Sequence, residues 1–257
     1  MTSPIFALLE RRLAAAGALP FITYYDDETG ERTELSAITL ANWVAKTANL
    51  LQDGLDVAPG QRVAVLLPPH WQTAAVLLGA WSVGGVVTQA TPANIFVTSE
   101  DRLGDFLDPE AEEIFEHLVG VSLRPLGAPM QLRPLGVTDF AAEVLVYGDH
   151  FAPYTPIDPD AIALRVGRLE LTGRSVVAAT TELAGRLGLG PEDRLLVDVE
   201  TVRDAGPLPW LLAPLVAGAS IVLCRRADPD KLQHRAETER VTVTIGMHVD
   251  GIRAAGS

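Results

Sequence analysis

The apolar residues at the start of the chain follow helical spacing and then a strand-like alternation. Apolar positions recur on one face of residues 3–17 after a Ser-Pro start, which predicts an amphipathic helix. Residues 20–35 alternate apolar and polar side chains around a charged Glu-Thr-Gly tip, which predicts a β-hairpin. Ser36 is then expected to cap a second helix, whose apolar stripe leaves Lys46 facing solvent.

A strand-helix-strand unit follows this second helix. Residues 63–67 form an uninterrupted apolar run after a Pro-Gly turn, and such a run is typical of a strand buried on both faces. A helix is expected from about residue 70 to Ser82, and a short strand over residues 86–89. This order of elements predicts a parallel sheet covered by helices.

Residues 91–155 show a weaker pattern. Two helix starts are expected, one at Ser99 and one at Asp108, and the second helix is expected to continue through Leu118. The string LRPLG occurs at residues 123–127 and again at residues 132–136. We interpret this single short repeat as two similar turns, because a solenoid needs several copies to bury a core.

The remainder of the chain repeats the alternation of strands and helices. A hairpin closed by the two-residue turn Gly167-Arg168 is expected to lead into a helix that starts at Ser175, and Asp228 is expected to start the last helix. The further strands are expected at residues 194–197, 219–223 and 241–245.

These elements define the predicted fold class, which is α/β. We expect two layered lobes with mainly parallel sheets covered by helices. The proline-rich stretch at residues 151–160 is the expected boundary, so that residues 1–155 form the first lobe and residues 156–257 the second.

Charge and composition exclude several classes of function. The chain has 20 basic and 33 acidic side chains and a formal net charge of −13, which disfavours binding to nucleic acid or to anionic membranes. The apolar stretches are too short and too polar for a membrane span, and the N-terminus lacks the order of a signal peptide, so a soluble cytoplasmic protein is expected. Cys224 is the only cysteine and the five histidines are scattered, so no disulfide and no metal site are expected.

Three segments, in this order, resemble the N-terminal domain of the AMP-forming adenylating enzymes, the superfamily of acyl-CoA synthetases, luciferases and peptide-synthetase adenylation domains. The segment at residues 33–87 is similar to that family's helix, its G-x-x-P-G-D-R-V-A strand and its following helix and glycine pair. The segment LAGRLGLGPEDRLLV at residues 183–197 fits the next part. The segment at residues 207–246 is similar to the family's L-L-x-P-L-x-x-G-A motif and the strand after it.

The chain departs from this family at the nucleotide loop. In the family, a loop rich in glycine, serine and threonine and ending in lysine lies between a strand and a G-V-x-L-T-H-x-x-L segment, and its backbone N–H groups surround the phosphates of ATP. Residues 162–166 fit the strand and residues 169–176 fit the second segment, but only Gly167-Arg168 lies between them. The family's adenine and ribose motifs and its C-terminal lid would follow Ser257, so no lid domain is expected.

The resemblance and its departures together predict a protein without catalytic residues or cofactors. The expected function is that of an acyl-CoA synthetase-like binding or scaffold protein, either non-catalytic or with residual activity, because transfer of a nucleotidyl group depends on the missing phosphate contacts. One alternative is a partial adenylate-forming ligase subunit completed in trans by another chain. The other is a different reaction in the cleft that corresponds to the active site of the resembling enzymes. The expected partners are a second copy of the chain, another protein, or a small acyl or nucleotide ligand.

Four residues are candidates for ligand binding. Thr172, Arg174 and Ser175 at the start of a helix could hold a phosphate or a carboxylate, but a simple helix cap with a solvated arginine explains the same residues. Trp210 lies in a proline-flanked segment near the expected acyl pocket and is the candidate for lining a remaining cleft. His70 is expected to lie at a helix start rather than to act as a base.

Overall fold

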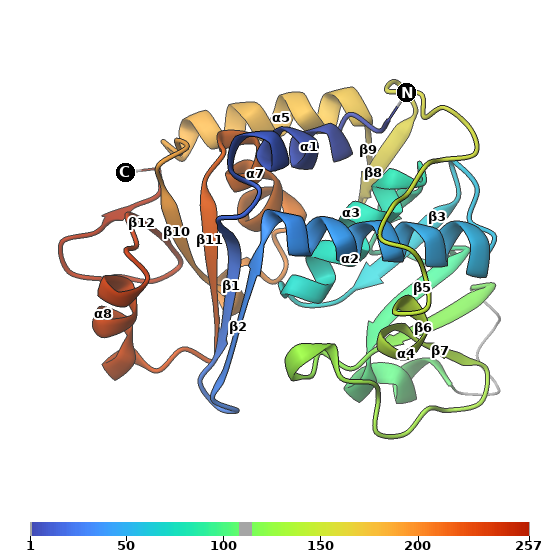
Figure 1. Cartoon of the computed structure of the whole chain (residues 1–257), viewed down its shortest axis with the longest axis horizontal. Helices are drawn as coiled ribbons and strands as arrows, with labels where there is room; N and C mark the ends of the chain where they lie inside the picture. Colours follow the sequence, from blue (N-terminus) through green and yellow to red (C-terminus); the bar gives the residue numbers. More distant parts are fainter. Residues whose placement is uncertain (1, 108–114, 257) are drawn as a thin grey trace. The chain divides into compact units, whose positions relative to one another are not determined.

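The computed structural model describes residues 2–107 and 115–256 and has the predicted α/β architecture (Figure 1). The chain divides into two compact units. The first contains the described residues of Met1–Ala7, Leu40–Leu67 and Gln72–Val176, and the second contains those of Leu8–Thr39, Pro68–Trp71 and Val177–Ser257.

The first unit is built on a sheet of seven described strands in the order β7-β6-β5-β3-β4-β8-β9. Neighbouring strands are parallel, except that β8 and β9 pair in antiparallel fashion. The strands are β3 (Arg62–Leu66), β4 (Val86–Thr88), β5 (Ile95–Ser99), β6 (His117–Val121), β7 (Val137–Asp139), β8 (Ile162–Val166) and β9 (Leu169–Thr172).

Most of α2 and α3 and several shorter helical segments belong to this unit. Asp139 caps the short helix α4, because its carboxylate accepts hydrogen bonds from the backbone N–H groups of Ala141 and Ala142. The helical segments are α2 (Ala37–Asn49), the π-helix η1 (Leu50–Gly54), α3 (Trp71–Ser82), the 3₁₀ helices η2 (Glu100–Phe106) and η3 (Pro125–Gly127), and α4 (Phe140–Val144).

The apolar run predicted as a buried strand lies in the middle of this sheet. Val63 and Ala64 are fully buried in β3, and β5 lies on one side of β3 and β4 on the other. Phe96 of β5 contacts the ring of Phe106 at a centroid distance of 4.4 Å and that of Phe115 at 5.7 Å. A strand covered on both faces needs such a continuous apolar sequence, which explains why the pattern predicted it.

The second unit is built on a sheet of six described strands in the order β13-β12-β10-β11-β1-β2. All neighbours are parallel except the β1–β2 hairpin, which confirms the hairpin predicted at residues 20–35. The strands are β1 (Pro20–Asp26), β2 (Glu31–Ser36), β10 (Arg194–Asp198), β11 (Ser220–Arg225), β12 (Val243–Ile245) and β13 (Arg253–Ala254).

Most of α1 and α5 and all of the later helices belong to this second unit. Asp228 caps α8 as predicted, since its side chain accepts a hydrogen bond from the N–H of Asp230. Gly218 ends α7 in the left-handed conformation, with a φ of 79°. The helices are α1 (Phe6–Ala16), α5 (Gly173–Arg186), α6 (Val199–Val202), the π-helix η4 (Leu208–Leu212), α7 (Ala213–Ala217) and α8 (Pro229–Thr238).

Each of the two sheets contains strands from both sides of the expected boundary at residue 155. The N-terminal β1–β2 hairpin pairs with β11, while β8 and β9, which follow residue 155, pair into the sheet of β4. The compact units are therefore interleaved along the chain, because strand pairing joins residues that are distant in sequence. The two consecutive lobes of residues 1–155 and 156–257 remain a proposal.

Two local predictions are wrong. Leu118 does not continue a helix but lies buried in strand β6, where it pairs with β5 and β7. Lys46 does not simply face solvent, because its ammonium group donates a hydrogen bond to the carbonyl oxygen of Tyr147 at 2.5 Å. The helix start predicted at Asp108 lies outside the described residues. In the described part of the chain, no helix is both long and apolar enough to cross a membrane.

Candidate functional site

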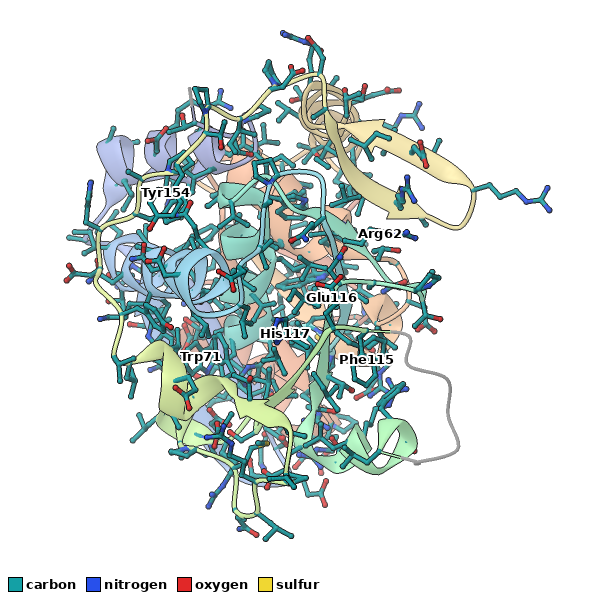
Figure 2. The ribbon with its side chains drawn as sticks, turned by 90° about the vertical axis from the view of Figure 1, so that its right-hand side faces the viewer. Arg62, Trp71, Phe115, Glu116, His117 and Tyr154 are labelled. Carbon is teal, nitrogen blue, oxygen red and sulfur yellow. The ribbon has the colours of Figure 1, made fainter. Side chains whose placement is uncertain are left out.

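The hairpin β8–β9 lies at the position where the resemblance to the adenylating enzymes predicts that the nucleotide loop is missing. Val166 pairs with Leu169, so the connection is the two-residue turn Gly167-Arg168, as predicted. Gly167 has a φ of 57° and Arg168 has no positive φ, and a glycine at the first central position is what a type II′ hairpin turn requires. Figure 2 shows this hairpin as a narrow two-stranded yellow ribbon.

The two faces of this hairpin differ in chemistry. On one face, Arg165 forms an ion pair with Glu170 across the strands at 2.8 Å. On the other face, Val166 and Leu169 lie opposite each other, and their exposed fractions are 53% and 56%. The hairpin therefore offers solvent one charged pair and one apolar pair. It does not present the row of backbone N–H groups that a phosphate loop would supply.

Thr172 and Ser175 lie together at the start of α5. The hydroxyl oxygen of Thr172 accepts a hydrogen bond from the backbone N–H of Ser175 at 3.1 Å, and the two hydroxyl groups are 3.0 Å apart. Thr172 directly precedes the first residue of α5, so this geometry is that of an N-cap. The cap already satisfies one of the N–H groups that an anion would need.

Arg174 lies beside this cap but is directed at a carboxylate of the same unit. Its guanidinium group donates two hydrogen bonds to Asp160, at 2.9 Å and 3.3 Å, and both side chains are exposed. These hydrogen bonds hold the pKa of Asp160 below its ordinary value. Thr172, Arg174 and Ser175 are thus close in space, but their contacts are those of a helix cap and a surface ion pair. Their role in ligand binding stays a prediction.

The cap can be tested by two neighbouring substitutions. We expect Thr172→Ala to lower the free energy of unfolding by about 1 kcal/mol, because a helix N–H loses its acceptor. Arg174→Gln should leave stability unchanged, since an exposed ion pair is screened by solvent. Urea denaturation followed by circular dichroism measures both values. If phosphate stabilised the native chain and Arg174→Gln abolished that stabilisation, the anion-site interpretation would replace the cap.

Trp210 is buried in the π-helix η4 of the second unit, with an exposed fraction of 3%. It does not line the cavity beside Arg12 that is described below. Burial in an apolar segment accounts for a tryptophan at this position. A contribution of Trp210 to a ligand site stays a prediction.

The second unit contains a buried cluster of aromatic rings that includes a histidine. The ring of His70 meets the ring of Tyr24 in β1 edge-on at 4.3 Å, and Trp71 lies 5.5 Å away. Burial, and then the positive charge of Arg225, lower the pKa of His70 to about 3. His70 is therefore neutral near pH 7 and is shielded from solvent. No local sequence pattern reveals this cluster, because β1 and residue 70 meet only in the folded unit.

Neither thiol nor metal chemistry is indicated by the described side chains. Burial raises the pKa of the Cys224 thiol to about 11, so the thiolate is scarce near pH 7. Across residues 2–107 and 115–256, no group of three histidine, cysteine, aspartate or glutamate side chains could hold a metal ion.

Comparison of the sequence with known proteins shows the family of this chain. No protein-family model matches the chain. A protein of Mycobacterium tuberculosis described as a TIGR03089 family protein is 43% identical over 253 residues, which cover 94% of this chain and 99% of that protein. The sulfoacetate–CoA ligase of Cupriavidus necator is 33% identical over 187 residues, which cover 65% of this chain and 35% of the ligase.

Solved structures share the fold. The acyl-CoA synthetase of Brucella canis superposes with a TM-score of 0.74 at 19% sequence identity, over 95% of this chain and 47% of that enzyme. The chain thus spans about half the length of this enzyme, and the likeness concerns the fold alone. The chain has the fold of the acyl-CoA synthetases. Because it is 43% identical to the mycobacterial protein over nearly the full length of both, this chain belongs to the TIGR03089 family.

Proposed function

We propose that this chain is an acyl-CoA synthetase-like binding protein that does not activate carboxylates by itself. The observation that carries the proposal is the two-residue turn between β8 and β9. It stands where the resembling enzymes have a phosphate-binding loop. The ligand proposed for such a scaffold is a small acyl or nucleotide metabolite, or a protein partner.

The physical argument concerns the charge that must be stabilised. Adenylate formation moves negative charge on the phosphates of ATP, and catalysis of such transfers consists mostly of fixed donors and cations aimed at that charge. The turn offers Gly167 and Arg168, and no lysine lies in the hairpin. Loss of a single oxyanion donor lowers a rate by about 100- to 1,000-fold, so loss of a whole loop should abolish measurable turnover.

The comparisons support the acyl-CoA synthetase-like scaffold in this proposal. The sulfoacetate–CoA ligase is named as a ligase, and this chain matches about a third of it. A shared scaffold does not imply a shared reaction, because function depends on the residues of a site. The substrate in the name of that relative is therefore not carried over to this chain.

Nucleotide binding and turnover test the proposal. We expect ATP with magnesium to leave the melting temperature of the purified chain unchanged, although a ligand at 100 times its Kd would stabilise the protein by about 2.7 kcal/mol. We also expect no pyrophosphate release with a panel of carboxylic acids. A thermal-shift measurement and a coupled pyrophosphate assay provide the two measurements.

The control is the variant Arg168→Gln, which removes the only cation of the turn. Stabilisation by ATP that this variant abolishes would show that the hairpin still holds phosphate, and the proposal would fail. Pyrophosphate release by the purified chain would also overturn it. Release that requires a second purified chain would favour the ligase subunit completed in trans.

A further inference from the structure

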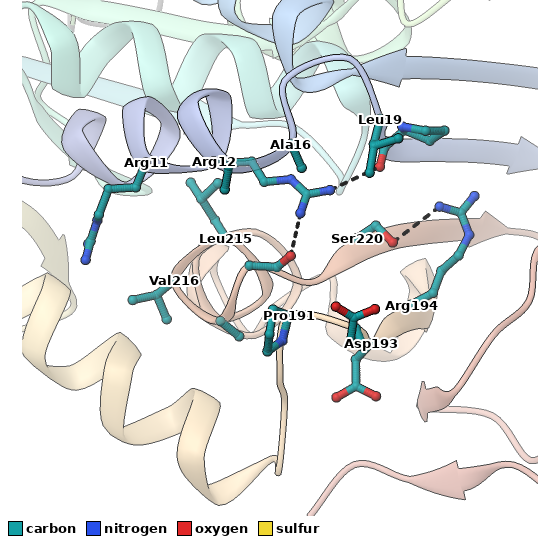
Figure 3. A pocket seen from close by; sticks show the side chains of 15 residues that line it. Arg11, Arg12, Ala16, Leu19, Pro191, Asp193, Arg194, Leu215, Val216 and Ser220 are labelled. Atoms are coloured by element: carbon teal, nitrogen blue, oxygen red, sulfur yellow. Dashed lines mark hydrogen bonds between the residues drawn. The ribbon is translucent and has the colours of Figure 1, made fainter.

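A half-open cavity lies within the second unit, at the amino-terminal ends of strands β10 and β11 (Figure 3). Its volume is about 590 Å³, which is the size of a site for a small organic molecule. Arg194 and Ser220, the first residues of these strands, lie on one wall, and residues of α1 lie on another. Ligands of parallel α/β sheets bind at the carboxyl ends of the strands, so this cavity is distinct from the expected nucleotide site.

Helix α1 makes both the charge and the space of this cavity. Arg12, Ala15 and Ala16 line it together, because residues three and four positions apart share one face of a helix. The two alanines leave the volume beside the guanidinium group of Arg12 unfilled. Leu19, which follows the helix, adds an apolar side chain that is 59% exposed.

The guanidinium group of Arg12 is fixed in place by the backbone. Its Nη1 donates to the carbonyl oxygen of Gly218 at 2.5 Å, and its Nη2 donates to that of Pro20 at 3.3 Å (Figure 3). Each of these nitrogens carries a second N–H, and the described side chains provide no carboxylate within ion-pair distance of Arg12. Burial lowers the pKa of Arg12, as expected for a cation without a counter-ion.

The other charges around the cavity largely cancel. Arg194 is paired with the buried Glu239, and Asp193 accepts a hydrogen bond from Arg253 at 2.9 Å. Arg11 at the rim has no hydrogen bond or ion pair among the described residues, while the exposed Glu192 contributes the opposite charge. Arg12 therefore remains as a fixed positive charge that forms no ion pair among the described residues, although the chain as a whole carries −13.

Part of the lining that faces α1 is apolar. Pro191, Leu215 and Val216 line it, and Figure 3 shows Val216 on the side of Arg11 and Pro191 below Arg12. One positive group that keeps a second N–H on each Nη nitrogen, beside these apolar side chains, fits a ligand with an anionic head and an apolar chain. A carboxylate matches the two donors, because guanidinium groups bind carboxylates in bidentate fashion.

We propose that this cavity binds an organic carboxylate with an apolar chain, whose head group is held by Arg12 and whose chain lies against Ala15, Leu19 and Val216. The inference supplies a ligand for the binding role proposed above and rests on that role. It does not depend on the absence of the nucleotide loop, because the cavity involves neither β8 nor β9.

Calorimetric titration of the full chain with the straight-chain acids from butanoate to decanoate tests this proposal. We expect binding that tightens with chain length, whereas octanol, which lacks the charge, and inorganic phosphate, which lacks the chain, should bind at least about tenfold more weakly than octanoate. Octyl phosphate separates a general anion site from a carboxylate site. If it binds more tightly than octanoate, the assignment to carboxylates is wrong.

Three variants locate the bound acid. Arg12→Gln should weaken octanoate binding by about 10- to 100-fold, since a charge-assisted hydrogen bond is lost. Arg12→Gln also removes the hydrogen bonds to two backbone carbonyl groups, so a second variant is needed. Ala15→Trp should abolish binding because the indole fills the cavity, while helix α1 stays folded. Arg11→Gln should weaken binding by about threefold or less, as expected for a rim charge.

Arg168→Gln is the matched control for charge, because it removes one exposed arginine from the other unit. It should leave octanoate binding unchanged. Absence of octanoate binding at millimolar concentration, or equal affinity in the native chain and in Ala15→Trp, would overturn the inference. Either result would leave the ATP and pyrophosphate measurements intact, so the two proposals fail separately.

Discussion

Replacing Glu239 with alanine is expected to lower the free energy of unfolding by about 3 to 5 kcal/mol, because the substitution leaves buried positive charge without its partner. The side chain of Glu239 is only 4% exposed. Chemical denaturation monitored by tryptophan fluorescence measures the loss. It is among the largest effects we expect for a polar residue of this chain.

The size of this effect follows from the number of groups that Glu239 joins. Its carboxylate accepts a hydrogen bond from the hydroxyl of Tyr25 at 2.5 Å. It also accepts hydrogen bonds from the guanidinium groups of Arg32, at 3.0 Å, and of Arg194, and both of these contacts are ion pairs. Arg194 also donates to the hydroxyl of Thr23 at 2.9 Å. Helix α8, which ends beside Glu239, is thereby connected to β1, β2 and β10 of the same sheet.

The same carboxylate should make stability depend on acid pH. Burial by itself would raise the pKa of Glu239, but the hydrogen bonds from Tyr25, Arg194 and Arg32 outweigh burial and hold the pKa below its ordinary value of 4.5. A depressed pKa stabilises the folded state above the ordinary value, and this stabilisation is lost as the pH falls through the folded-state pKa. Native chain should therefore lose stability below about pH 4.5, and Glu239→Gln should lose less over that range.

The matched control is Glu182→Ala. Glu182 pairs with Arg186 one turn along α5, and both side chains are exposed, so its removal should change stability by less than about 0.5 kcal/mol. If Glu239→Ala lowered the free energy of unfolding by no more than this control, water would be solvating the arginine side chains in place of Glu239. The buried-charge argument would then be wrong.

Local pattern predicted those parts of the fold whose cause is local. Residues 63–66 of strand β3 form an uninterrupted apolar run because the strand is covered on both faces, and the β8–β9 turn needs a glycine at a positive φ. The cap at Asp228 follows from a side chain that reaches an N–H two residues later. In each case the residues that determine the structure are within a few positions of each other.

Pairing between distant segments could not be predicted in this way. Nothing in residues 20–26 indicates that β1 will lie beside β11, some 200 residues later along the chain. The helix start before Leu118 predicts a helix through this residue, whereas tertiary pairing with β5 and β7 makes its segment a strand. Strand propensity depends on such neighbours more than helix propensity does.

The candidate sites divide along the same line. The cap made by Thr172 and Ser175 could be read from their spacing, and the structure contains it. The cavity beside Arg12 could not, because Arg12 meets the carbonyl of Gly218 across 206 positions of sequence. In the sequence, Arg11 and Arg12 are only two cations on an amphipathic helix, and a solvated role explains them equally well.

The second large effect is expected for Trp81→Ala, which should lower the free energy of unfolding by about 3 to 5 kcal/mol. Trp81 of α3 is 1% exposed, so its removal leaves a cavity in the core of the first unit. Its indole N–H also donates a hydrogen bond to the carbonyl oxygen of Ala163 in β8 at 2.8 Å. The variant therefore loses both packing and the buried partner of a strand carbonyl.

The loss of this hydrogen bond should appear in the hairpin β8–β9. Native-state hydrogen exchange measured by mass spectrometry should show faster exchange of residues 162–172 in Trp81→Ala than the global loss of stability accounts for. Trp81→Phe separates the two causes, because it retains most of the apolar contact but not the N–H, and it should cost about 1 to 3 kcal/mol. The opposite result would be an equal increase in the exchange rates of residues 162–172 and of β6 in both variants. It would show that the hydrogen bond from Trp81 to Ala163 does not stabilise β8, and that pairing with β4 and β9 alone holds this strand.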